Sequence, residues 1–201
     1  MLYSTHLFFS KIIYENMLCG NCVKIKKVSF KYGNIKPDLM LNFKEIPHNY
    51  ASSANYIVSQ INFLIGETKS LKELLSKEFA VKLGIIDHYV ADFFCMPHNK
   101  NLIKKNIIAH YIYERKIDAI CKQIKICKLK EYIYTNGIVL RTDICISDFI
   151  NSRYDNYKKK SFSAINDVLF AIQTCISVNN YVIETCMSNF NSIAAKKIKV
   201  C

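Results

Sequence analysis

The stretch HYVADFFCMPH, His88–His98, and the later stretch HYIYE, His110–Glu114, decide the expected fold and chemistry of this chain. Each stretch begins with a histidine that has a carboxylate four residues later, Asp92 in the first and Glu114 in the second. Residues four apart lie on one face of an α-helix, so each pair can bind a cation from one side. We therefore expect two helices facing a shared metal site, with His98 placed over the same cavity from the connection between them.

The other histidines strengthen this interpretation. One such pair alone is a weak indication, because a lone histidine is more often a hydrogen-bonded structural residue than a ligand. Here two pairs and His98 occur together, while His6 opens an expected helix and His48 follows Pro47, shortly after Asp38. Imidazole and carboxylate groups without a required thiolate are typical of zinc in hydrolytic sites. The sequence predicts a zinc site.

The periodicity of apolar residues predicts an all-α protein, a single-domain helical bundle spanning residues 1–201. The segment Val23–Phe30 is expected to be a short strand or extended, and the turn-rich Tyr32–Asp38 to be irregular. Little sequence remains for a sheet. The expected helices run from Thr5 to near Gly20, then over about Ser53–Leu64, Ser70–Phe94, Asn101–Ile126, Lys128–Tyr134, Asp143–Tyr157 and Ser161–Ile198, the last with a break at Val178–Asn180.

The composition indicates a cytoplasmic protein. Nine scattered cysteines, an odd number, do not form a disulfide scaffold, and Cys19–Cys22 is a lone C-x-x-C without a redox context. We expect neither a signal peptide nor a transmembrane segment. The net charge of +12 attracts polyanions, but it accompanies an abundance of lysine, isoleucine, asparagine and tyrosine that a biased genome would also produce. No specific nucleic-acid binding is expected.

The ordered motifs make the chain resemble the zinc-dependent phospholipase C family, whose helical fold is shared with single-strand-specific nucleases. The resemblance covers about Ser4–Arg115, a motif-bearing part of residues 4–115, and fades in the helical part of residues 116–201. It includes all five histidines of the chain. The motifs are Thr5-His6-Leu7, Gly33-Asn34-Ile35-Lys36-Pro37-Asp38, Pro47-His48, His88-x-x-x-Asp92 with His98, and His110-x-x-x-Glu114.

The resemblance implies a particular distribution of ligands. It assigns one zinc to His48, His88 and Asp92, and a second zinc to His98, His110 and Glu114, with Asp92 bridging. In the family a third zinc shares this aspartate and takes a histidine matching His6, together with the amino group and carbonyl of an N-terminal tryptophan. That tryptophan is absent here, so either the N-terminal residue in its place reaches the metal or the third site is weak or vacant. Asp38 matches an active-site aspartate proposed as general base or as a metal neighbour.

The implied activity is hydrolysis of a phosphodiester, most simply a phospholipid cut on the glycerol side of the phosphate. Clustered dications polarise phosphoryl oxygens and lower the pKa of water. A nuclease or nucleotidase on the same fold and a zinc-binding protein without turnover are the alternatives. Secreted members carry a C-terminal β-sandwich for membrane docking; we expect none here, so that peripheral contact with an anionic membrane would use the helical surface.

Some neighbouring residues are expected to have no role in the site. Tyr89, Phe93 and Phe94 are interpreted as core or cavity wall rather than as a cage for a cationic head group. Asp87 and Asp118 lie off the predicted ligand face or outside the motifs, and we expect them to be solvated. The head group, the activity and the oligomeric state stay open.

Overall fold

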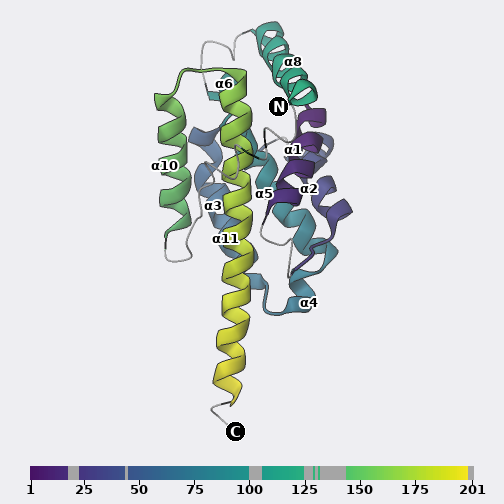
Figure 1. Ribbon diagram of the computed structural model, residues 1–201, viewed down its shortest axis with the longest axis vertical. Helices are drawn as coiled ribbons and strands as arrows, with labels where there is room; N and C mark the ends of the chain where they lie inside the picture. Colours follow the sequence, from purple (N-terminus) through teal and green to yellow (C-terminus); the bar gives the residue numbers. More distant parts are fainter. Residues whose placement is uncertain are drawn as a thin grey trace.

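The computed structural model describes residues 1–17, 23–43, 45–99, 106–124, 129, 131 and 144–198, with side chains up to residue 192. These residues are helical without any strand, which confirms the all-α prediction (Figure 1). The helices are α1 (Tyr3–Asn16), α2 (Lys27–Leu39), the 3-10 helix η2 (Leu41–Phe43), α3 (Tyr50–Glu67), α4 (Leu71–Leu74), α5 (Lys77–Phe93), α6 (Met96–Asn99), α8 (Ile107–Gln123), α10 (Ile146–Lys159) and α11 (Ala164–Ile198).

Helix α5 is the centre of the molecule. It packs against α2, α3 and α11, and every residue from Ile86 to Cys95 is buried. The predicted core residues Tyr89, Phe93 and Phe94 are fully buried among them. Helix α11 runs along the length of the molecule, and its C-terminal end extends past the other helices (Figure 1). Because the segment Ile86–Cys95 is buried on all sides, any polar group on it must find a partner inside the protein.

In the described part of the chain, no helix combines the length and apolar character that a bilayer crossing requires.

Side-chain caps fix where the site-bearing helices begin. The Asn49 side chain accepts a hydrogen bond from the Ser52 amide at the start of α3. Ser76 caps α5 in the same way, and Asn106 caps α8. Such a cap stabilises a helix by about 1 kcal/mol, and by fixing the first turn it also fixes which face later residues occupy.

Two glycines allow α2 and α5 to cross backbone against backbone. A Cβ atom added to Gly33 would lie 2.3 Å from the Val81 carbonyl oxygen, and one added to Gly84 would lie 2.3 Å from the Phe30 carbonyl oxygen. The prediction of an irregular Tyr32–Asp38 was therefore wrong: this segment belongs to α2 despite its internal proline. Packing against α5 outweighs the weak local preference for a turn.

Other predicted boundaries also need correction. The first helix ends at Asn16, and the expected Ser70–Phe94 helix is divided into α4 and α5. Val23–Lys26 has no regular structure, but the rest of the expected extended segment belongs to α2. The predicted Cys19–Cys22 motif lies outside the described residues, as does the expected helix Lys128–Tyr134 except for residues 129 and 131.

Two further predictions were wrong for the same reason: the break in the last helix and the solvation of Asp87. Helix α11 is continuous through Asn179, whose side-chain amide donates to the fully buried Asp87 carboxyl at 2.9 Å. An asparagine inside a helix is thus explained by a buried partner rather than by a chain break. Asp118 is also buried and accepts hydrogen bonds from Ser4 and Lys122, so the solvation predicted for it was wrong as well.

Candidate metal centre

The structure brings all eight sequence-predicted site residues into one region. Six different segments contribute them, which explains why no local pattern could show the arrangement. The contributors are His6 of α1, Asp38 at the end of α2, His48 before α3, His88 and Asp92 of α5, His98 of α6, and His110 and Glu114 of α8.

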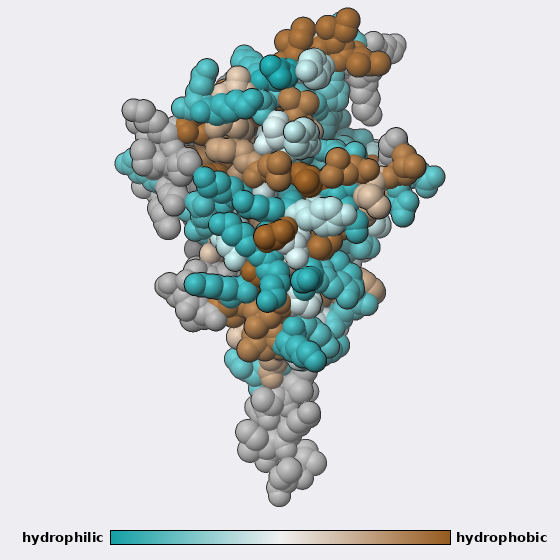
Figure 2. Space-filling model, turned by 90° about the vertical axis from the view of Figure 1, so that its right-hand side faces the viewer, coloured by the Kyte–Doolittle hydropathy of each residue, from teal (hydrophilic) through white to brown (hydrophobic). Residues whose placement is uncertain are grey.

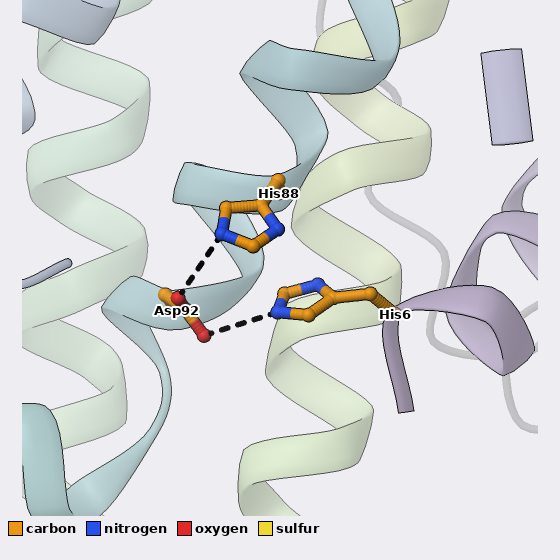
Figure 3. Close-up of side chains that lie close together, drawn as sticks. All are labelled: His6, His88 and Asp92. Carbon is orange, nitrogen blue, oxygen red and sulfur yellow. Dashed lines mark ion pairs between the residues drawn. The ribbon is translucent and has the colours of Figure 1, made fainter. Parts of the chain in front are cut away.

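The buried carboxylate of Asp92 is the common neighbour of four imidazole rings. Its Oδ2 atom lies 2.8 Å from His48 Nδ1 and 3.6 Å from His88 Nε2. Its Oδ1 atom lies 3.5 Å from His6 Nε2 and 3.7 Å from His98 Nδ1. Figure 3 shows the rings of His6 and His88 approaching this carboxylate from α1 and from the preceding turn of α5. A carboxylate so placed can bridge cations bound on either side of it.

His88 is oriented by a backbone group that the sequence did not indicate. Its Nδ1 atom lies 2.8 Å from the Asn34 carbonyl oxygen, to which the ring N–H donates. Its Nε2 atom then faces His48 Nδ1 at 3.2 Å and Asp38 Oδ1 at 3.6 Å. A ring N–H held by a carbonyl is the usual arrangement behind a metal-ligating histidine, because it fixes the tautomer and the ring plane. The close crossing of α2 and α5 makes this contact possible.

The second group of donors lies between α6 and α8. Glu114 Oε1 lies 3.1 Å from His98 Nε2 and 2.9 Å from His110 Nε2. The sulfur of Cys95 also belongs to this group, with its ligand atom within 4.8 Å of those of His98 and Glu114. Sequence reasoning missed Cys95, although its position three residues before His98 offered a signal. Burial raises the pKa of this thiol well above its usual range, so it is neutral.

The amino group of Met1 reaches the middle of the centre. Its nitrogen lies 2.7 Å from Asp92 Oδ1, 3.3 Å from Glu114 Oε1 and 3.5 Å from His98 Nε2. Burial disfavours the ammonium form, but the nearby carboxylates of Asp92 and Glu114 outweigh this and raise its pKa to about 11.

The pKa shifts of the donors favour the protonation states that bind a cation. Burial alone would raise the pKa of Asp92 and Glu114, but the Met1 ammonium and neighbouring histidines hold both below the usual range. Burial lowers the pKa of His88 and His98, so these rings are neutral with a lone pair available. Ionised carboxylates and neutral imidazoles are the protonation states that metal binding requires.

Unpaired buried atoms show that the residues present fit a metal. Both ring nitrogens of His6 and Nδ1 of His98 are buried without a hydrogen-bond partner. Leaving such an atom unpaired costs about 1–3 kcal/mol, which a bound cation would offset. The Met1 ammonium already stands where a cation would meet Asp92, Glu114 and His98. Imidazole nitrogens and carboxylate oxygens in this number suit zinc.

A buried carboxyl of α11 supports the segments that carry the second group of donors. Asp167 accepts hydrogen bonds from the Met96 amide at 3.0 Å, the Tyr113 hydroxyl at 2.9 Å and the Tyr157 hydroxyl at 2.8 Å. Met96 begins the turn that carries His98, and Tyr113 precedes Glu114. Sequence reasoning missed Asp167, since no sequence spacing relates it to these partners.

The centre opens to solvent through a small cavity. The cavity has a volume of about 180 Å³ and is lined by His48, Asn49, Pro97, His98 and His110. The side chains of His48 and His110 are about a quarter to a third exposed, whereas those of His6, His88 and Asp92 are fully buried. The centre is therefore accessible from the side of His48 and His110.

A comparison with protein families shows to which family the chain belongs. The profile described as zinc dependent phospholipase C matches residues 5–165, a longer stretch than the motifs alone had indicated. No curated protein and no solved structure matches the chain. The matched residues include every histidine and all three acidic residues of the centre. The chain belongs to the zinc-dependent phospholipase C family.

Proposed function

We propose that this protein is a zinc-dependent phosphodiester hydrolase that cleaves a phospholipid on the glycerol side of its phosphate. The observation that carries the proposal is the buried Asp92 carboxylate with four imidazole rings around it, in a chain of this family. A single structural cation would not need so many donors. Several clustered cations are typical of phosphoryl-transfer sites.

We assign the donors to zinc ions as follows. His48, His88 and Asp92 hold one ion, and His98, His110 and Glu114 hold a second. His6 and the amino group of Met1, which would have to release its proton to bind zinc, form a third site with the shared Asp92. The contacts described above support each set, because the donors of each set converge on Asp92 or on Glu114.

The chemistry of the reaction divides between the metal and the chain. Zinc bound in such a centre polarises the phosphoryl oxygens and lowers the pKa of water toward neutrality. The chain holds the donors at fixed positions before substrate arrives, which avoids reorganisation during the reaction. The cavity beside His48 and His110 would receive the phosphate group.

Asp38 is our candidate for the group that accepts a proton from the attacking water. Its Oδ1 atom lies 3.6 Å from His88 Nε2, and its side chain is 26% exposed, so it lies at the boundary between the centre and solvent. Burial, with a contribution from Asp92, raises the pKa of this carboxyl above its usual value. A carboxylate of raised pKa is a stronger base than an ordinary aspartate.

A direct test is turnover of a soluble short-chain phosphatidylcholine by the purified, zinc-loaded protein. Release of phosphocholine and diacylglycerol, abolished by a chelator and restored by zinc, is the expected result. Release of nucleotides from single-stranded DNA without lipid cleavage would replace the lipid substrate with a nucleic acid. A fully zinc-loaded protein inert on both would contradict the enzymatic proposal.

A further inference from the structure

The first two turns of α8 expose an unusual concentration of large apolar side chains. Ile107 is 83% exposed, Ile108 72%, Tyr111 53% and Ile112 61%. Figure 2 shows a hydrophobic area at the end of the molecule where α8 begins in Figure 1. Single exposed apolar residues are ordinary, but a contiguous group usually marks an interaction site. We call these four residues the apolar tip of α8.

The helical spacing puts the apolar tip on one face. Residues 107, 108, 111 and 112 are related by steps of one and four, which cover a continuous strip along the helix. The two metal-ligand candidates of α8, His110 and Glu114, lie on the neighbouring strip and point into the centre. The same two turns therefore present donors to the site on one strip and apolar groups to solvent on the adjacent strip.

Basic residues follow the apolar tip on the same strip. Arg115 and Lys116 come four residues after Tyr111 and Ile112 and are exposed. The chain as a whole carries a net charge of +12. Exposed apolar side chains that can insert between lipids, with Lys and Arg close by that attract anionic head groups, are typical of protein surfaces that rest on a membrane.

The apolar tip also adjoins the mouth of the metal centre. His110 belongs to the same turns of α8 and lines the cavity through which a substrate would enter. A second exposed apolar stretch, Leu39, Met40 and Leu41, directly follows Asp38 at the end of α2. Exposed apolar residues thus lie next to two residues of the metal centre, His110 and Asp38. A surface that binds them would lie close to the centre.

We propose that the apolar tip of α8 docks the protein on an anionic phospholipid surface and so presents lipid head groups to the cavity beside His110. The occupant is the lipid surface itself, chosen for its charge complementarity to the exposed Arg115 and Lys116 and because His110, on the same turns of α8, lines the cavity. This inference rests on the proposed function, because docking on a lipid surface would bring substrate to the cavity only if the substrate is a phospholipid.

The decisive experiment measures binding to vesicles by flotation, which does not depend on turnover. The full-length, zinc-loaded protein is mixed with vesicles of phosphatidylcholine and phosphatidylserine, and the variant carries Ile108→Ser with Ile112→Ser. We expect binding at least about tenfold weaker, because two side chains that would leave water no longer do so. The matched control carries Val28→Ser and Leu71→Ser, two exposed apolar residues of α2 and α4, and should bind like the original protein.

A second variant tests the electrostatic part. Arg115→Gln with Lys116→Gln should weaken binding to the anionic vesicles by about fivefold for each removed charge. The difference should disappear on vesicles of pure phosphatidylcholine and shrink as salt rises. Equal weakening on neutral vesicles would overturn the electrostatic role.

Other outcomes would overturn the proposal without ambiguity. Undiminished vesicle binding by the isoleucine variant would exclude the apolar tip as the docking surface, and an equal loss in the control would make the effect non-specific. Sedimentation analysis showing a dimer that the same substitutions dissociate would assign this face to a second copy of the chain. Zinc content and thermal unfolding show whether each variant is folded, and Ile112→Ser alone provides a milder variant.

Failure of the docking proposal and failure of the proposed function give different results. Vesicle binding that depends on the apolar tip, without phosphocholine release from soluble lipid, would contradict the function alone. Release from soluble lipid, with vesicle binding that ignores the apolar tip, would contradict the docking surface alone.

Discussion

His88 shows at the residue scale how a backbone contact prepares a side chain to bind metal. Its Nδ1 donates to the Asn34 carbonyl, and its Nε2 faces the other donors. We predict that His88→Ala or His110→Ala loses zinc and lowers the Tm by about 5 °C or more, since losing about 2 kcal/mol of binding free energy has this effect in a chain of this size. Elemental analysis and calorimetry check both; unchanged zinc content in both variants would contradict the assignment.

Asn34→Ala is the matched control for the His88 substitution. It removes the side chain, whose amide donates to the Phe30 carbonyl at 3.2 Å, but keeps the backbone carbonyl that orients His88. We expect this variant to retain its zinc, with a stability loss of about 1 kcal/mol. Zinc loss as large as in His88→Ala would show that the side chain, rather than the carbonyl, supports the centre.

Asp38 allows binding and catalysis to be separated. Asp38→Asn keeps the size of the side chain and removes its basicity, and other donors surround His88 and Asp92. We expect most of the zinc to remain while kcat falls by about 100-fold or more, the usual contribution of a general base. Steady-state kinetics on soluble lipid, with zinc measured on the same sample, check the prediction. Unchanged kcat would remove the catalytic role of Asp38.

At the scale of elements, the crossing of α2 and α5 positions Asn34 and Asp38 beside His88. Gly84→Ala would put a Cβ atom 2.3 Å from the Phe30 carbonyl oxygen, so the helices must separate. We expect a destabilisation of about 1–3 kcal/mol and weaker zinc binding. Gly66→Ala is the control: nothing lies within 4 Å of its added Cβ, and alanine should stabilise α3 by about 0.5–1 kcal/mol. Urea unfolding of both variants measures the difference, and equal effects would contradict the close crossing.

Asp167 joins α6, α8 and α10 to α11, and its titration should make the stability of the fold depend on pH. Burial raises the pKa of this carboxyl to about 6 from 3.8, so the folded protein holds its proton more tightly than the unfolded chain. Its stabilising contribution is therefore present at low pH and is lost as the pH rises through about 6. Relative to Asp167→Asn, the original protein should lose about 2 kcal/mol between about pH 4.5 and 7.5.

Urea unfolding in the presence of a chelator, at the two pH values, checks this prediction without interference from zinc loss. A difference between the two proteins that does not change with pH would show that Asp167 has an ordinary pKa. Asp167→Ala should be less stable than Asp167→Asn at both pH values, since it leaves three donors without an acceptor.

Local patterns predicted most helices but failed where tertiary contacts decide. The glycine and proline of Tyr32–Asp38 are typical of a turn, yet α2 continues through them because it packs closely on α5. The asparagines near Val178 suggested a break, yet α11 continues because Asn179 bonds the buried Asp87. In both cases the deciding partner lies on another helix, which no local window of sequence contains.

At the scale of the whole molecule, the metal centre was far more predictable than its supports. Histidines paired with carboxylates at helical spacing carry a chemical signal that survives without structure. The groups that support the centre give no such signal in the sequence. The Asn34 carbonyl is a backbone group, and Asp167 has no spacing relation to its partners. The Met1 amino group comes close to Asp92 only through the tertiary fold. The apolar tip could not be predicted from the sequence either, because its exposure depends on what packs against α8.

We infer that the buried Asp92 carboxylate and the five histidines form a polynuclear zinc centre. The most direct test is elemental analysis of the protein purified without chelators, with zinc counted per chain and repeated after dialysis against chelator and readdition of zinc. We expect two or three zinc ions per chain, restored after removal. A protein that contains no zinc and takes up none would contradict it.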